Sequence, residues 1–291
     1  MKPGTASASS TAPRTPRTGR RRSAHWISAA TLIIVAVVVN VPLLNALFVS
    51  FRAERDITRS PFAVDAGFTF EHYANALGAA GYQFPAYFIN SAMISVGTVA
   101  LVTFISFTGA YAIVRLGLGG TSLLRVVTSL RLLPAIAFAV PFFMFFAALQ
   151  LIDSVFALIL VNTFLNLPIA IMLMTAGLHE IPMEIEEAAM VDGCSVYRSL
   201  LTVVWPLMAP TAAAVAVLTF IFTWSDYLFA VILTSTTSTP VTVGAANFVT
   251  STGIRWGDVS AITVLSVLPP MIFGVLARRQ LVAGLSSGAV K

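Results

Sequence analysis

Charge is the scarcest property of this sequence. Only 10% of its 291 residues are Asp, Glu, Lys or Arg, whereas 57% are hydrophobic. Soluble domains usually carry about 25% charged residues. This chain therefore has too little polar surface to cover a water-soluble fold, and we expect a membrane protein whose main solvent is the bilayer.

Cysteine, histidine and nucleotide-binding motifs are also rare or absent. The single Cys194 excludes an intramolecular disulfide and any metal site built from several cysteines. His25, His72 and His179 all lie at or beyond the ends of apolar segments, so neither a catalytic histidine at membrane depth nor a metal site is predicted. No G-x-x-x-x-G-K-[ST] phosphate loop occurs. We therefore expect a protein that is not an enzyme, does not hydrolyse ATP itself and binds no cofactor or metal.

Six apolar segments are each long enough to cross about 30 Å of hydrocarbon at about 1.5 Å per residue. They cover residues 27–50, 86–114, 126–150, 155–177, 209–234 and 259–277. Several contain proline, which favours kinked helices around a cavity. The sequence predicts an all-α polytopic protein with a disordered basic tail over 1–24 and a six-span membrane domain over 25–291, whose core covers about 86–278.

The distribution of Lys and Arg predicts the orientation of these spans. If the N-terminal tail is cytoplasmic, thirteen basic residues lie on the cytoplasmic side, with Arg131 close to the membrane edge, and four lie outside. Both termini and the loop 178–208 are then cytoplasmic, and the segments 51–85 and 235–258 face outward. Because the basic residues are spread between apolar segments, they indicate a plasma-membrane protein rather than nucleic-acid binding.

One predicted cytoplasmic loop is unusually acidic. Five of the twelve acidic residues lie within 180–192, around the sequence "EEAAMVDG". Pro182 suits the first turn of a helix and Gly193 suits its end, while Ser195 can cap a second helix that runs to Pro206. The residues alone leave two interpretations open: an amphipathic connector whose acids face water, and a surface that binds basic groups of a partner.

The longer stretch "EEAAMVDGCSVYRSLLTVVWPLMAP" resembles the EAA loop of ABC importer permeases, in which Glu-Ala-Ala precedes a glycine, an aliphatic stretch and a proline. The segments "FINSAMIS", "AYAIVR", "TWSDYLFAVILTS" and "RRQLVAGLSSGAVK" are similar to other parts of the carbohydrate-uptake branch, and most of all to the smaller, six-span permease of maltose-type importers. The resemblance covers nearly everything after residue 25. It implies the type I ABC importer permease fold, but no motif selects a particular sugar.

The resemblance also implies a mechanism and a set of partners. The acidic helix would dock in a groove of a cytoplasmic ATPase, through the coupling residues Glu187, Ala188, Ala189, Asp192 and Gly193. The expected partners are a second permease subunit that completes a heterodimer, two copies of the ABC ATPase that binds the ATP, and an extracytoplasmic solute-binding protein. This chain would form half of the translocation path.

Polar residues within the spans are candidates for that path. Asn162 and Asn166 share one helix face, and Thr219, Thr223 and Asp226 share another. Their amides and hydroxyls suit sugar hydroxyls, although hydrogen bonds between helices are an equally ordinary use of such residues. An ion-coupled secondary transporter is the alternative function, for which more buried carboxylates and an internal repeat would be expected.

Overall fold

The structure is a computed structural model that describes residues 19–59, 67–250 and 253–276. The chain divides into two compact units, residues 1–45 and 46–291. Its principal helices are α1 (Gly19–Ser50), α2 (Glu54–Arg59), α3 (Glu71–Ala74), α4 (Phe84–Val114), α5 (Gly120–Ser129), α6 (Ala139–Ala148), α7 (Val155–His179), α8 (Met183–Val191), α9 (Val196–Ser199), α10 (Trp205–Trp224), α11 (Leu228–Leu233), α12 (Val241–Gly244) and α13 (Trp256–Leu276). Two short strands, β1 (Val249–Thr250) and β2 (Gly253–Ile254), form an antiparallel pair.

The membrane-spanning pattern is close to the predicted one. Within the described residues, five helical stretches are long and apolar enough to cross a bilayer, and a bent pair of shorter helices makes a sixth. The five are Ala30–Ser50, Phe84–Val114, Val155–His179, Val196–Trp224 and Trp256–Leu276. The prediction of a helical, multi-pass protein is thus confirmed. Helix α1 begins at Gly19, inside the predicted tail 1–24; the rest of that tail and the C-terminal stretch 277–291 lie outside the described residues.

The predicted third span, 126–150, is not one helix. It is a pair of helical stretches, Gly120–Leu132 and Ala135–Ala148, that meet at an angle of 97°. Proline disfavours helical geometry in the residue before it, and both Leu133 and Pro134 have an extended backbone with ψ of 133°. Neither half is long enough to cross the bilayer by itself, so the two halves can form at most one span, which is broken in its middle.

The predicted fifth span, 209–234, has the wrong limits. The helix starts at Val196 and ends at Trp224, and a separate short helix, α11, follows. Pro206 does not end the helix as predicted, and the helix continues through it directly after a π-helical turn. A π-helical turn at Leu200–Val204 joins α9 to α10, so the second loop helix continues directly into a membrane span.

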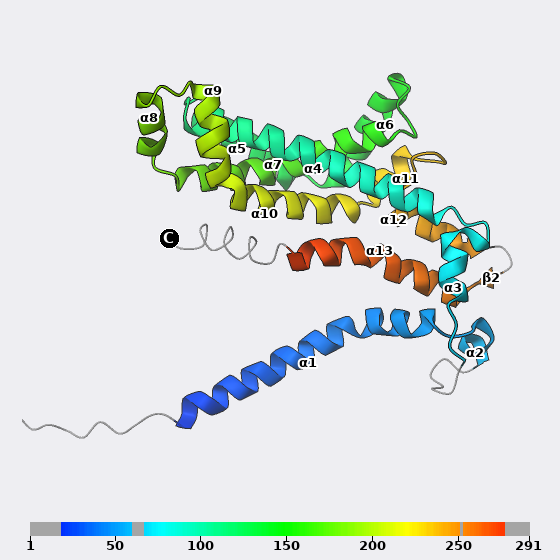
Figure 1. Ribbon diagram of the computed structural model, residues 1–291. Coiled ribbons are helices and arrows are strands. Elements are labelled where there is room, and N and C mark those ends of the chain that lie inside the picture. The colour runs from blue at the N-terminus through cyan, green and yellow to red at the C-terminus, as the bar shows by residue number, and fades with distance from the viewer. Residues whose placement is uncertain (1–18, 60–66, 251–252, 277–291) are drawn as a thin grey trace, which may run out of the picture. The chain divides into compact units, whose positions relative to one another are not determined.

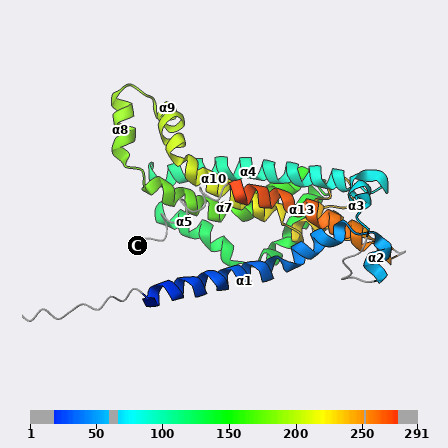
Figure 2. The same ribbon diagram turned by 60° about the horizontal axis from the view of Figure 1, so that its bottom comes forward.

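Helices α4, α7 and α10 lie side by side in the second unit, and α13 runs along α10 (Figures 1 and 2). The buried face of α4 includes a stripe of mostly small residues at helical spacing: Ser91, Ser95, Thr98, Val102, Ser106 and Ala110. Small residues let helices approach closely in lipid, where no hydrophobic driving force acts between them. At Gly177 of α7 a Cβ atom would lie 2.6 Å from Thr211 Oγ1 of α10, so only glycine permits this contact.

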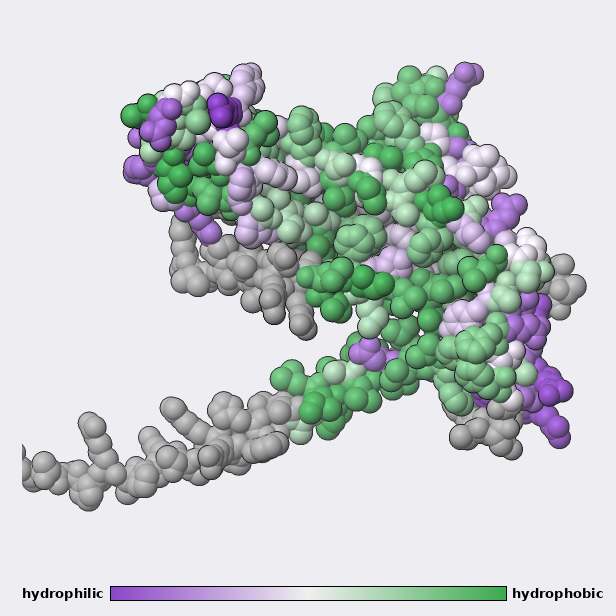
Figure 3. Space-filling view, in the orientation of Figure 1, coloured by the Kyte–Doolittle hydropathy of each residue, from purple (hydrophilic) through white to green (hydrophobic). Residues whose placement is uncertain are grey.

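Apolar side chains cover the middle of this bundle, and hydrophilic ones gather at its two ends, at α8–α9 and near α2 (Figure 3). Hydrocarbon cannot hydrogen-bond to the backbone, so a spanning segment must satisfy its peptide groups internally, as these helices do. The apolar surface is therefore the surface that faces lipid or other membrane helices.

A buried polar network closes the end of the bundle near α2, α3 and α13. The carboxylate of fully buried Asp258 lies 2.6 Å from His72 Nδ1 and accepts hydrogen bonds from Asn75 and Tyr82. It also pairs with Arg255 at 3.2 Å. Burial and the bond to Asp258 both raise the pKa of the Tyr82 hydroxyl. The network joins segments that are distant in the sequence, since His72 and Asp258 are 186 positions apart.

A second carboxylate organises the turn between α6 and α7. Asp153 accepts hydrogen bonds from the backbone N–H groups and hydroxyls of the loop that follows α11, namely from Ser235, Thr236, Thr237 and Ser238. Burial alone would raise the pKa of Asp153, but these hydrogen bonds outweigh it and hold the pKa far below its usual range. From α4, Asn90 donates to Thr237 O and Thr239 O of the same loop. Asp153 and Asn90 thus tie the loop to the bundle from two sides.

We expect Asp258→Asn to lower the melting temperature of the purified protein clearly, because it removes the charge that faces His72 and Arg255 in a buried site. Breaking a buried pair in this way costs about 3–5 kcal/mol. Glu71→Gln is the matched control: Glu71 also pairs with Arg255, but its side chain is 62% exposed, and loss of such a pair costs about 1 kcal/mol or less. Scanning fluorimetry in nanodiscs compares the two, and equal shifts would contradict the structural role of Asp258.

Candidate functional site

Helices α8 and α9 form a hairpin that projects from one end of the bundle (Figures 1 and 2). Helix α8 ends as predicted, because Gly193 takes a left-handed φ of 88° and Cys194 N donates to Ala189 O at 3.0 Å. Ser195 caps the second helix by accepting from Arg198 N. The hairpin is therefore an ordered structure with its own caps.

The predicted coupling residues lie on the outside of this hairpin. Glu187, Ala188, Asp192 and Gly193 are exposed, and Ala189 is half-buried. Small alanines between carboxylates leave a surface that another protein can approach closely. The exposed position of these residues is compatible with docking, while their role in coupling stays a prediction.

The neighbouring Glu186 has a different role, which the sequence reasoning missed. It is 2% exposed and accepts a hydrogen bond from Arg115 Nε at 2.5 Å. Arg115, just after the end of α4, also donates through Nη2 to Ile181 O at 2.7 Å. This arginine therefore holds both the start of the hairpin and the buried face of α8 against the end of α4. An arginine directly after a span, opposite an acidic helix, is the sequence signal that could have revealed this pair.

A cavity of about 340 Å³ lies among α7, the end of α10 and the break after α5. The predicted path residues Asn162, Asn166 and Asp226 line it. Asn162 Nδ2 donates to Asp226 Oδ2 at 3.3 Å, and Asn166 Nδ2 donates to Asn162 O at 2.8 Å. The structure thus brings polar residues from two predicted helix faces together in one cavity. Arg131 lines it as well, although the sequence analysis assigned this residue to the cytoplasmic edge.

The two threonines of the predicted path differ in their surroundings. Thr223 is buried, and its hydroxyl oxygen lies 3.5 Å from Asn166 Nδ2. Together with Asn162 and Asp226 it lines a second, small cavity. Thr219 is also buried, but it does not line either of these cavities. Asp226 follows the end of α10, so it reaches the cavity from the α10–α11 connection rather than from the helix face that the spacing predicted.

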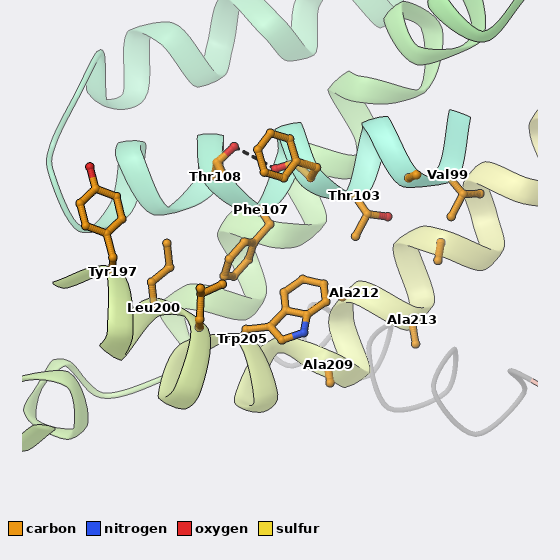
Figure 4. Close-up of a pocket in the computed structure, with 14 residues that line it drawn as sticks. Val99, Thr103, Phe107, Thr108, Tyr197, Leu200, Trp205, Ala209, Ala212 and Ala213 are labelled. Carbon is orange, nitrogen blue, oxygen red and sulfur yellow. Dashed lines mark hydrogen bonds between the residues drawn. The ribbon is translucent and has the colours of Figure 1, made fainter. Parts of the chain in front are cut away.

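A larger groove of about 760 Å³ is lined by residues of α4 and of the α9–α10 helix (Figure 4). Phe107 and Trp205 line it in edge-to-face contact, with their ring centroids 5.0 Å apart, and Ala209, Ala212 and Ala213 line it as well. Thr108 Oγ1 already donates to its own helix at Phe104 O. The groove is almost wholly apolar, so it offers a sugar few hydrogen-bonding partners and is not the candidate path.

Several spans, one of them broken beside a polar cavity, and an ordered hairpin outside the bundle define a multi-helix membrane transport subunit. The sequence profile of the family described as "Binding-protein-dependent transport system inner membrane component" matches residues 103–286. The chain belongs to this family, and it is an ABC importer permease subunit.

Named relatives are similar along most of the chain. The trehalose/maltose transport system permease protein MalG of Thermococcus litoralis is 31% identical over 262 residues, which cover 89% of this chain and 94% of the relative. The trehalose transport system permease protein SugB of Mycobacterium tuberculosis is 31% identical over 94% of this chain and 99% of its own length. A chain of a bacterial ABC transporter that imports alginate has a TM-score of 0.75 at 22% identity, with 92% of this chain and 99% of that chain covered. This last likeness confirms the permease fold.

We expect Glu186→Gln to loosen α8, because it leaves Arg115 buried without its countercharge. Glu187→Gln, the adjacent and exposed position, is the matched control. Hydrogen–deuterium exchange of the peptide that covers 183–191 should become at least about tenfold faster in Glu186→Gln, which corresponds to about 1.4 kcal/mol of lost protection. Exchange in Glu187→Gln should stay within about twofold of the parent. A similar response of the two variants would show that the buried pair does not anchor the hairpin.

Proposed function

We propose that this chain is a membrane-spanning permease subunit of an ATP-driven importer, that its cargo is a sugar, and that it forms half of the translocation path. The observation that supports the proposal most directly is the α8–α9 hairpin: it exposes Glu187 and Ala188 outward and is anchored inward to α4 by the Glu186–Arg115 pair. Relatives named for trehalose and maltose transport support sugar as the cargo class.

The coupling step follows from how the hairpin is connected. One end of it is held by Arg115 at the end of α4, and the other end continues through the π-helical turn into α10. A displacement of α8 by a partner would therefore reach two of the helices that pack side by side in the bundle. In this proposal the partner is a cytoplasmic ABC ATPase, present in two copies, which binds the ATP that this chain does not.

Two further partners complete the proposed importer. A second permease subunit would supply the other half of the path, and a heterodimer is expected from the resemblance to maltose-type importers. An extracytoplasmic binding protein would deliver the cargo. The family description names dependence on a binding protein, and a bacterial alginate ABC transporter of similar fold has been solved in complex with a periplasmic protein.

The proposed path runs by the cavity that Asn162, Asn166 and Asp226 line, with Thr223 beside it. Both asparagine side chains donate to groups of the protein, and within the described residues neither amide oxygen accepts a hydrogen bond. These oxygens can accept from sugar hydroxyls. Thr219 lies away from the cavity, so it fits helix packing better than a place in the path.

The function is tested in proteoliposomes that contain this chain with its partner ATPase, second permease and binding protein. The probe is the radiolabelled sugar that raises the melting temperature of that binding protein. We expect uptake that requires ATP, and we expect Glu187→Lys to abolish it and to weaken co-purification of the ATPase, because the reversed charge faces a basic groove. Arg59→Glu, an equally large charge change on exposed α2, should leave both unchanged. Uptake that persists without ATP but needs an ion gradient would favour the secondary transporter instead.

The proposed orientation places both termini and the 178–208 loop in the cytoplasm. Ala246, exposed beyond α12, would then face outward. In a Cys194→Ser background, Ala246→Cys should react with a membrane-impermeant maleimide on intact cells, whereas Tyr197→Cys, exposed on α9, should react only after permeabilisation. The reverse pattern would overturn the orientation.

A further inference from the structure

Arg131 stands at the point where the third span breaks. It is the middle residue of the turn Leu130–Leu132 that ends the first half, directly before the extended Leu133 and Pro134. Its side chain lines the 340 Å³ cavity opposite residues of α7. An ionisable side chain within an apolar span is costly, and it usually faces a cavity or a partner of opposite charge.

No such partner is present in the described part of the chain. Arg131 makes no hydrogen bond and no ion pair there, and its guanidinium lies 5.7 Å from the centre of the Phe222 ring. The contact with Phe222 is a cation–π interaction that steadies the group without using its N–H donors. The N–H donors of the guanidinium are therefore unused within the described residues, and the exposed side chain can offer them to a ligand in the cavity.

Asp226 lines the same cavity and yet does not neutralise Arg131. Its two oxygens are engaged by Asn162 Nδ2 at 3.3 Å and by Phe229 N at 3.4 Å, and no ion pair within 4.0 Å joins it to Arg131. The cavity thus has two chemically different walls. One wall is cationic and only donates; the other presents the carboxylate of Asp226 and the free amide oxygens of Asn162 and Asn166, which accept.

A neutral sugar can donate its hydroxyls to the amides and to Asp226, but it offers the guanidinium of Arg131 only neutral hydroxyl acceptors. A sugar that also carries an acidic group satisfies both walls. Guanidinium binds carboxylate, sulfonate or phosphate oxygens through paired, charge-assisted hydrogen bonds. The volume lies at the small end of the range for ligand sites, about 300–1,000 Å³, and suits one sugar ring with its substituent.

We propose that the cavity binds a sugar unit bearing an acidic group, with Arg131 as the residue that binds the acid and Asn162, Asn166 and Asp226 as acceptors for the hydroxyls. This inference rests on the proposed function and specifies its substrate class. Arg131 is then a specificity-determining residue of the path.

The test uses the complete importer in nanodiscs without the binding protein, so that the permease alone selects the ligand. Four probes share one scaffold: glucose, glucuronate, glucose 6-phosphate and glucosamine. Affinity is measured by isothermal titration. We expect glucuronate or glucose 6-phosphate to bind at least about tenfold more tightly than glucose, as a hydrogen bond to a charged group predicts, and glucosamine to bind no better than glucose.

The variants assign that preference to one side chain. Arg131→Gln should reduce the preference for the acidic probes to about twofold or less, while glucose affinity stays within about twofold; Arg131→Lys should keep part of it. Arg125→Gln is the matched control, because Arg125 lies on the same segment and bonds only to Thr121 O and Ser122 Oγ of its own helix. It should preserve the preference.

Three results would overturn the inference: acidic probes that bind no more tightly than glucose, a preference for glucosamine, or Arg131→Gln that separates the two permease subunits and so marks an interface residue. Each is distinguishable from failure of the proposed function. ATP-dependent uptake with the binding protein restored would persist if only the substrate class is wrong, and would be absent if the chain is not an importer subunit.

Discussion

Hydrocarbon offers no hydrogen-bonding partner, and this one constraint shapes the whole protein. It forces the backbone into helices, it removes the hydrophobic driving force between them, and it makes each buried polar group costly. Because no hydrophobic driving force acts between helices in lipid, α4, α7 and α10 are held together by close packing. The small residues along α4 and the glycine at position 177 permit that packing. Because buried polar groups are costly, the protein contains few charged groups.

Those few charges are placed where segments distant in sequence must be held together. Glu186 and Arg115 join the hairpin to α4 at one end of the bundle, and Asp258 collects His72, Asn75 and Arg255 at the other. A protein with only 10% charged residues thus devotes several of them to fixing its ends. In the proposed importer, such fixed ends would pass a push on the hairpin to α4 and α10 instead of losing it in a loose loop.

The cavity shows the opposite arrangement. Asn162 and Asn166 keep their amide oxygens unused, and Arg131 keeps its donors unused, beside a break that bends the chain by 97°. In the proposed importer, these unused polar groups that line one cavity are where a ligand would complete the hydrogen bonding. The groove beside Trp205 is lined almost wholly by apolar side chains, with Thr103, Thr108 and Tyr197 as its few polar residues, and its greater volume does not make it a better candidate for a sugar.

Much of the fold could be predicted from the sequence, because helix length, apolar composition and the caps at Gly193 and Ser195 are local properties that act within a few residues. The roughly correct spans, the hairpin and the shared faces of Asn162 and Asn166 all follow from such local patterns. Only the tertiary structure decided which of two adjacent glutamates is buried, that the third span breaks at Leu133 and Pro134, that α10 begins before Pro206, and that Arg131 enters the cavity. The burial of Glu186 and the entry of Arg131 into the cavity depend on partners far away in the sequence, and the free energy of such contacts is not encoded in the pattern of any single segment.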